Sequence, residues 1–430
     1  MKPGLITTLF VILLSPGTRN ATEAQAPAAV PPRGTIAYIR DGAEIRLIEP
    51  DGTRDRRLWV HPRPELAANL GITSLAWRPD GEELAFASSH NAALSWFESD
   101  IYALRADGTK LRKLTNSPDP AEFGRFPKGD VRVAVRNDNA PYGTGPREYL
   151  FIVYVSGAPK AQSVTLAPGA SKTLLFKDVA DLGKVPQPIV AMLGRYRWAS
   201  TGVDVEAGRT AEAAPLQILG DGLTDFGAGG PAWRNDGAKL SYVLAGSLWS
   251  LPADPRVGSH AEPATFGGKK SPLLRAYDWG VTTSTANQIF YGGGLGDYNI
   301  YQVTEGSESV GTKLLTYDPE ETALLQDIHC LPDGSGFLFA RTKGLNGSSL
   351  HRYVFATKKL STVREFENRT VRCFSLSPDG DWMVLEFGRS PLDIDPDPAA
   401  SQEPELWLMR ANGKDLRLLV KNGQSPSWSR

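Results

Sequence analysis

At 430 residues the chain is too long for a single small domain, and we expect two or three core-forming units. It is 41% hydrophobic and 22% charged, a composition that excludes an intrinsically disordered protein. The formal net charge is −1, so the chain lacks the basic excess typical of proteins that bind nucleic acids or anionic membranes.

The N-terminus has a pattern of its own. One basic residue is followed by a mostly apolar run from Leu5 to Leu14. This run is too short to span a bilayer and is typical of a secretory signal peptide. We therefore predict a signal peptide over residues 1–26, with its cleavage position left open, and a flexible leader over residues 27–34. The mature protein is expected to be periplasmic or secreted, with no transmembrane segment.

The segment SLAWRPDGEELAFASS, Ser74–Ser89, contains two alternating apolar runs around Pro-Asp-Gly. Alternation at period two predicts half-buried β-strands, and Pro-Asp-Gly is typical of a tight hairpin turn. Related segments read GPAWRNDG, DIHCLPDG and FSLSPDG, and AYDWG is a degenerate copy without the Asp-Gly turn. The turn aspartates of the last two full copies, Asp333 and Asp379, lie 46 residues apart. A period of about 40 to 50 residues with four short strands indicates a β-propeller.

The two ends of the chain complete this pattern. Residues 35–60 supply second, third and fourth strands with no first strand before them, whereas SPSWSR at 425–430 is a first strand with nothing after it. Pairing them closes a sixth sheet and removes an open edge.

A long interruption separates SLAWRPDG from GPAWRNDG, the next copy of the repeat. Residues 121–222 contain alternating strands with Pro-Gly turns and no helical period. Within them, VTLAPGASKTLLF resembles the edge hairpin of immunoglobulin-like modules in exported bacterial proteins. We therefore expect a β-sandwich inserted in the connection between two blades.

The combination of AWRPDGEELAFAS, SDIYALRADG and LRKLT resembles the TolB-like six-bladed β-propeller repeats, over roughly residues 33–120 and 223–430. The predicted fold is all-β: a six-bladed β-propeller closed by its N- and C-terminal segments, with the β-sandwich inserted between blades two and three. Blade two and part of blade one occupy residues 35–120, the sandwich 121–222, and the remaining blades with the closing strand 223–430. The resemblance implies an exported protein that recognises another protein or an envelope component.

Four polar residues are the candidate ligand-binding set. Asp278, Asp327, His329 and Arg372 are predicted at the starts of inner strands, where other copies of the repeat have small residues. Packing should not require their charge, so we expect them to be dispensable for folding and to line the channel mouth. The tryptophans three residues before the turn aspartates are instead expected to pack between blades.

A calcium site is a weaker hypothesis. Asp393, Asp395 and Asp397 alternate in a loop, and carboxylate oxygens are ligands that Ca²⁺ prefers. The calcium-loop template requires Gly and Glu at the positions that Pro398 and Pro404 occupy, which favours a solvated loop instead. No other cofactor is expected.

The chain has no G-x-S-x-G, Walker or dinucleotide-binding motif. The predicted function is therefore that of a monomeric binding module, with another envelope or periplasmic protein as partner. The alternative is a saccharide-active hydrolase or lyase that uses the carboxylates and histidine of the channel mouth. A third hypothesis makes the inserted sandwich the adhesive part and the propeller its scaffold.

Overall fold

A computed structural model describes residues 32–429, except residues 65–66, 68–70, 92–98, 116–123, 140–147, 184–185, 194–195, 220–226, 245, 255–261, 264–273, 283, 294–298, 318–322, 345–346 and 389–402. The regular elements in this part of the chain are β-strands. No helix among the described residues has the length and apolar character needed to cross a membrane. The predicted signal peptide and most of the leader lie outside these residues.

Five four-stranded antiparallel sheets are each built from four strands consecutive in the chain. The strands of these sheets are β4 (Ile72–Trp77), β5 (Glu83–Ser88), β6 (Asp100–Arg105) and β7 (Arg112–Lys113); β16 (Gly229–Trp233), β17 (Lys239–Leu244), β18 (Ser247–Pro252) and β19 (Glu262–Pro263); β20 (Leu274–Trp279), β21 (Gln288–Gly293), β22 (Ile300–Thr304) and β23 (Thr312–Leu315); β24 (Leu325–Cys330), β25 (Gly336–Lys343), β26 (Gly347–Val354) and β27 (Lys359–Phe366); and β28 (Thr370–Leu376), β29 (Trp382–Gly388), β30 (Glu405–Arg410) and β31 (Arg417–Lys421).

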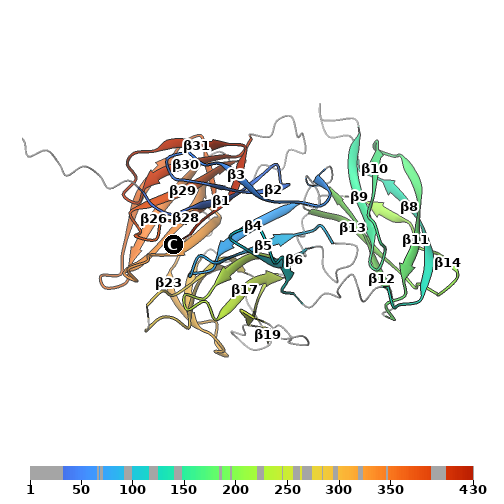
Figure 1. Cartoon of the computed structure of the whole chain (residues 1–430), viewed down its shortest axis with the longest axis horizontal. Helices are drawn as coiled ribbons and strands as arrows, with labels where there is room; N and C mark the ends of the chain where they lie inside the picture. The colour runs from blue at the N-terminus through green and yellow to red at the C-terminus, as the bar shows by residue number, and fades with distance from the viewer. Residues whose placement is uncertain are drawn as a thin grey trace, which may run out of the picture. The chain divides into compact units, whose positions relative to one another are not determined.

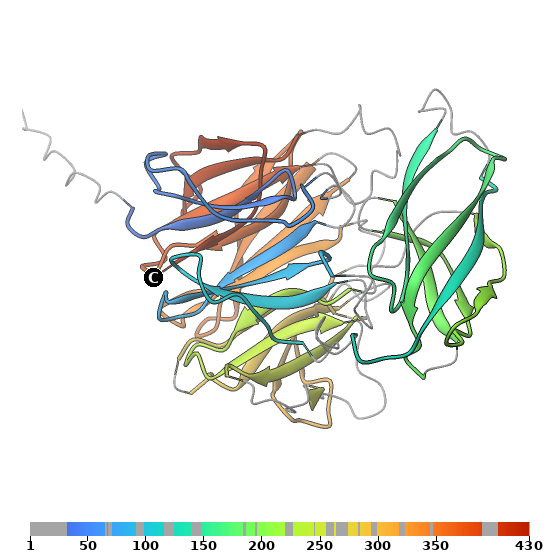
Figure 2. The same ribbon diagram turned by 45° about the vertical axis from the view of Figure 1, so that its right-hand side comes forward.

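A sixth sheet joins the two ends of the described chain. Its order is β3-β2-β1-β32, in which β32 (Gly423–Trp428) takes the place of a first strand beside β1 (Ile36–Arg40), β2 (Glu44–Ile48) and β3 (Arg56–Val60). Figure 2 shows the blue N-terminal strands beside the red C-terminal ones. The pairing runs antiparallel from Ile36 opposite Trp428 to Arg40 opposite Gly423. The predicted pairing of the two chain ends is therefore confirmed.

The first strands of the six sheets contact one another in a closed series. β32 contacts β4, and the series continues through β16, β20, β24 and β28 back to β32. Six apolar clusters lie between successive sheets; for example, Ile45 of β2 shares one with Phe86 of β5, and Ile36 of β1 shares another with Trp382 of β29. The chain is therefore all-β and propeller-like, because each sheet buries both faces against its two neighbours.

The repeated turn has the structure that its residues predict. In the first copy the Asp80 carboxylate accepts a hydrogen bond of 3.0 Å from the N–H of Glu82, and Gly81 has a φ of 73°. Asp236 and Asp333 accept the N–H two residues ahead in the same way. These aspartates are thus occupied in holding hairpin turns.

Two further sheets share one hydrophobic core. One has the order β10-β9-β12-β13, and the other pairs β11, β14 and β15 with β8 (Figure 1). Their strands are β8 (Lys128–Asn137), β9 (Tyr149–Val155), β10 (Gln162–Leu166), β11 (Ser171–Ala180), β12 (Gln187–Leu193), β13 (Tyr196–Val203), β14 (Thr210–Glu212) and β15 (Leu216–Ile218). Val133 and Leu174 from one sheet pack in a cluster with Phe151 and Ile189 from the other.

The expectation of a hairpin in VTLAPGASKTLLF is wrong. Its two strands, β10 and β11, belong to different sheets: β10 pairs with β9 and β11 pairs with β8. The Pro-Gly turn between them therefore carries the chain from one sheet to the other. Alternating strands on either side of a turn are compatible with both connections, because each gives one buried and one exposed face.

Candidate functional site

The first strands of the six sheets are the inner strands of the ring. A pocket of about 160 Å³ lies where these six inner strands end. We call it the inner-strand pocket. Its walls come from β4, β16, β20, β24, β28 and β32 and from the residues that follow five of them. The lining residues are Trp77, Arg78, Pro79, Trp233, Asn235, Asp278, Trp279, Val281, His329, Cys330, Pro332, Ser375, Leu376, Ser377, Pro378 and Trp428.

Four tryptophans at equivalent positions of the repeat contribute to the pocket. Trp233, Trp279 and Trp428 are almost completely buried, and Trp77 is half-buried. The indole N–H of Trp233 donates to the carbonyl of Ala76 in the neighbouring sheet at 3.1 Å. These side chains therefore pack between sheets, as predicted, and their edges also form part of the pocket wall.

Side chains one residue before the tryptophan position form hydrogen bonds across three sheet junctions. The Ser427 hydroxyl accepts the N–H of Trp77, and the Ser375 hydroxyl accepts the N–H of Trp428, each at 3.0 Å. Asp278 Oδ2 accepts the N–H of Cys330 at 2.7 Å. At equivalent positions of the repeat, serine and aspartate side chains thus accept a hydrogen bond from the equivalent main-chain N–H of a neighbouring sheet.

Asp327 forms a related contact one junction further on. Its Oδ2 accepts the N–H of Phe374 from β28 at 2.9 Å, and its Oδ1 accepts the N–H of Ile328 at 3.0 Å. These contacts count against the expectation that Asp278 and Asp327 are dispensable for folding. Each satisfies a main-chain N–H of the next sheet, and an unsatisfied buried donor would cost about 1–3 kcal/mol.

His329 lies between these two carboxylates. Its Nε2 is 3.2 Å from Asp327 Oδ2, its Nδ1 is 3.7 Å from Asp278 Oδ2, and its ring meets Phe374 edge-on at 4.8 Å. Burial by itself would lower the pKa of His329, but the charges and hydrogen bonds of Asp327 and Asp278 outweigh it and hold the pKa well above its ordinary value. We call Asp278, His329 and Asp327 the triad; its imidazolium joins two carboxylates.

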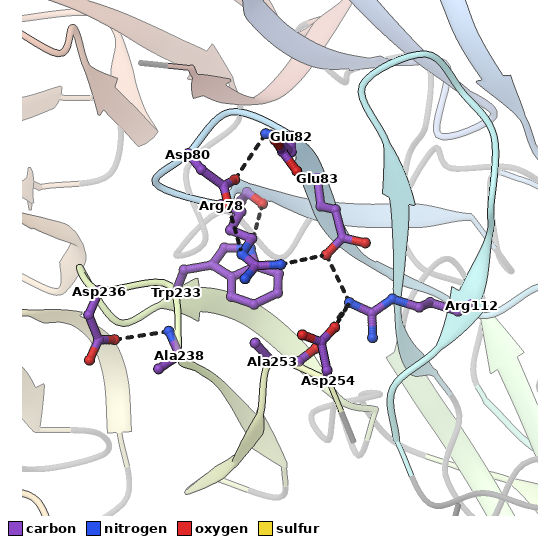
Figure 3. A network of polar contacts seen from close by, with 11 residues as sticks. Arg78, Asp80, Glu82, Glu83, Arg112, Trp233, Asp236, Ala238, Ala253 and Asp254 are labelled. Carbon is purple, nitrogen blue, oxygen red and sulfur yellow. Dashed lines mark hydrogen bonds and ion pairs between the residues drawn. The ribbon is translucent and has the colours of Figure 1, made fainter. Parts of the chain in front are cut away.

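Arg78 is the other cation on the pocket wall, and it is already paired. Its guanidinium lies 3.1 Å from Asp80 and 3.2 Å from Glu83, and it stands over the Trp233 ring at 5.5 Å (Figure 3). Glu83 also accepts a hydrogen bond of 2.8 Å from Arg112, which reaches the Ala253 carbonyl of the next sheet at 3.0 Å. Arg78 is therefore part of a network that joins two sheets.

The structure brings together three of the four predicted ligand-binding residues. Asp278 and His329 are the next-to-last residues of β20 and β24. They therefore lie near the ends of the inner strands, whereas the sequence analysis placed them at the starts. The expectation failed because both strands begin earlier than the alternating residues indicate. Asp327 contacts His329 from behind the pocket wall, whereas Arg372, the third residue of β28, is not among the pocket residues.

The calcium hypothesis falls on residues that the structure does not describe, because Asp393, Asp395 and Asp397 lie in the segment 389–402. Among the residues it does describe, no group of three or more His, Cys, Asp or Glu side chains is placed to hold a metal ion. The two cysteines, Cys330 and Cys373, are free thiols.

Comparison with known proteins gives weak likenesses only. No family model and no curated protein matches the chain. Among solved structures, TolB from Acinetobacter baumannii is 12% identical with a TM-score of 0.48, and the match covers 92% of this chain and 66% of that one.

Two other solved structures show similar values. A structure of putative TolB from Agrobacterium tumefaciens is 13% identical with a TM-score of 0.46, covering 92% of this chain and 91% of that one. The periplasmic gluconolactonase PpgL of Pseudomonas aeruginosa is 11% identical with a TM-score of 0.40, covering 92% and 99%. TM-scores below 0.5 at these identities do not establish a shared function.

Proposed function

We propose that the chain is an exported binding module, in which the six sheets are the blades of one closed propeller and the two further sheets an inserted β-sandwich. The inner-strand pocket is its recognition site, and its partner is another envelope or periplasmic protein. The signal-peptide pattern between Leu5 and Leu14 supports export.

The engagement of the triad carboxylates carries this proposal. Both oxygens of Asp278 and both of Asp327 accept main-chain N–H groups, at 2.7–3.0 Å. One oxygen of each carboxylate accepts an N–H of the next sheet, so both side chains already have a structural task at the junctions between sheets. A nucleophilic carboxylate would weaken such a hydrogen bond on forming a covalent intermediate, and we therefore favour binding over the saccharide-active alternative.

The size of the pocket supports a protein partner. Ligand sites for small molecules usually enclose about 300–1,000 Å³, whereas this pocket holds about 160 Å³. It suits one inserted side chain better than several sugar units, and tryptophan and arginine in its wall are residue types enriched where proteins bind each other.

A substitution that fills the pocket tests the proposal. Val281 lines the pocket at the edge of the cluster that contains Ala276 and Phe290, and its main-chain carbonyl accepts the Asn235 amide at 2.7 Å. Val281→Trp should fill the pocket while that hydrogen bond remains. The matched control is Leu111→Trp, at a residue that is 43% exposed and is not among the pocket residues.

The assay is affinity capture from a bacterial envelope extract, with the captured partner then purified and its Kd measured. We expect Val281→Trp to raise the Kd for the partner at least tenfold and Leu111→Trp to leave it unchanged. Equal binding by both variants would move recognition to another surface, the two-sheet insert first. Turnover of a saccharide or lactone that disappears in His329→Ala would instead favour the enzymatic alternative.

A further inference from the structure

The four tryptophans of the pocket wall differ in what their indole N–H groups bind. Those of Trp233, Trp279 and Trp428 each donate to an oxygen of the fold, at 2.8–3.1 Å. The indole N–H of Trp77 has no acceptor among the residues that the structure describes, although its nitrogen is buried. A buried donor without an acceptor is unfavourable, so an acceptor brought by a ligand would complete this side of the pocket.

Trp77 is also less enclosed than its three equivalents. It is half-buried, whereas the other three are 1–6% exposed. No hydrogen bond fixes the orientation of its indole, so a small rotation of this ring would present its N–H to an occupant of the pocket, and such side-chain adjustments are common when proteins bind. Two independent properties therefore distinguish the same side chain of the wall.

The charged groups of the wall favour an uncharged occupant. Among the residues described along the pocket, Asp278 is the only carboxylate, and its two oxygens already accept the N–H groups of Trp279 and Cys330. The two cations, Arg78 and His329, are each paired with carboxylates. An inserted acid would lie close to Asp278, and an inserted N–H donor would have to share oxygens that are already engaged. The wall therefore suits a group that accepts a hydrogen bond and donates none.

Proline is the residue that combines these properties. It has a main-chain carbonyl and no main-chain N–H. Its ring packs on aromatic side chains, as in the aromatic grooves that bind proline-rich segments in an extended conformation. The four indoles provide such a surface here, and a volume of about 160 Å³ suits a single inserted residue.

We propose that the inner-strand pocket binds a proline residue of the protein partner, whose ring packs against the tryptophans and whose carbonyl accepts the indole N–H of Trp77. This inference rests on the proposed function and names the residue that the partner inserts. Trp77 determines the specificity. Trp233, Trp279 and Trp428, whose N–H groups are engaged within the fold, form the fixed part of the wall.

Capped pentapeptides of the form Gly-Gly-X-Gly-Gly test the selectivity without the natural partner. X is proline, N-methylalanine or alanine, with lysine and glutamate as charged controls. N-methylalanine lacks the N–H but also the ring, so it separates these two properties of proline. Binding is followed by ligand-observed NMR. We expect the proline peptide to bind at least tenfold more tightly than the alanine, lysine and glutamate peptides, and the N-methylalanine peptide to lie between.

Two matched variants separate the free indole N–H from aromatic packing. Trp77→Phe keeps an aromatic ring and removes the N–H, so it should reduce the preference for proline over alanine at least fivefold. Trp233→Phe removes the same atoms, but its N–H is bound to the Ala76 carbonyl. It should therefore lower the melting temperature more than Trp77→Phe does and keep the preference for proline.

The indole signals report on the donor directly. The chain has ten tryptophans, and after ¹⁵N labelling the indole signal that is absent from Trp77→Phe identifies Trp77. The proline peptide should move this signal downfield, as formation of a hydrogen bond does. A Trp77 signal that stays in place while the proline peptide binds would overturn the inference.

Four other results would also overturn it: equal binding of the proline and alanine peptides, absence of binding at millimolar concentration, tighter binding of a charged peptide, or an unchanged proline preference in Trp77→Phe. Equal binding of the proline and N-methylalanine peptides would contradict the role of the ring. If the preference fails while Val281→Trp still abolishes capture of the partner, only the identity of the inserted residue is wrong. If Val281→Trp has no effect, the proposed function itself fails.

Discussion

The main-chain N–H of Trp77 donates a hydrogen bond of 3.0 Å to the hydroxyl of Ser427, 350 residues later in the chain. This contact joins the sheet that contains both chain ends to the sheet that follows it. Ser427 belongs to β32, which also pairs with β1, so one short strand contributes to the closure of the whole ring.

We predict that truncation after Gln424 prevents stable closure. It removes Trp428, which packs in the cluster with Ile36 and Val384, and it leaves β1 as an open edge. Thermal unfolding with light scattering should show aggregation and loss of a cooperative transition. Trp428→Ala should destabilise the full-length chain by about 3–5 kcal/mol. A truncated protein as soluble and stable as the full chain would refute this role of β32.

We predict that the six-sheet ring folds without the two-sheet insert. The six clusters between sheets contain no residue between 121 and 222 among those described. Replacing residues 121–222 with a short Gly/Ser linker should leave a single cooperative thermal transition, because a flexible linker closes such a loop at low entropic cost. Absence of that transition would show that the insert contributes to the core of the ring.

His329 should make the free energy of unfolding fall as the pH rises above about 6.5. Its folded pKa is raised, so the protonated imidazole stabilises the folded state fully below the unfolded pKa of about 6.5. That contribution is lost as the pH rises through the folded pKa. The free energy of unfolding in urea, measured from pH 6 upward, should therefore fall in the wild type more steeply than in His329→Gln. Parallel curves would contradict a charged His329.

His90 should have the opposite effect, at acid pH. Burial, with the nearby positive charges of His61 and Lys113, lowers the pKa of His90 to about 3. Between that pH and about 6.5 the unfolded chain binds the extra proton, so stability falls as the pH falls through this range. The loss is of the order of 5 kcal/mol, at about 1.4 kcal/mol per pKa unit.

A pair of matched histidine variants checks this acid effect. His90 packs against Tyr102 at 4.4 Å and His351 against Phe339 at 5.1 Å, so both stand in aromatic clusters. His90→Phe should flatten the urea-unfolding curve between pH 4 and 6.5, and His351→Phe should not. An unchanged acid slope in His90→Phe would place the acid sensitivity elsewhere.

The local structure of this protein follows from its sequence. Alternation at period two and the Pro-Asp-Gly turns depend on a few neighbouring residues, so the strand pairs around Asp80, Asp236, Asp333 and Asp379 were predictable. The pairing of the two chain ends was predictable as well, because residues 425–430 repeat the pattern of a first strand where residues 35–60 lack one.

Only the tertiary structure determines how these local pieces combine. Pro-Gly turns look alike whether the next strand pairs with the last or crosses to another sheet, so the separation of β10 from β11 could not be read from residues 162–180. The triad joins residues of two different sheets, and Asp327 reaches the N–H of Phe374 in a third. Those contacts depend on the register of one inner strand against the next, which no local pattern encodes. The same register turns Asp278 from an apparently dispensable charge into a hydrogen-bond acceptor for Cys330 and a wall of the pocket.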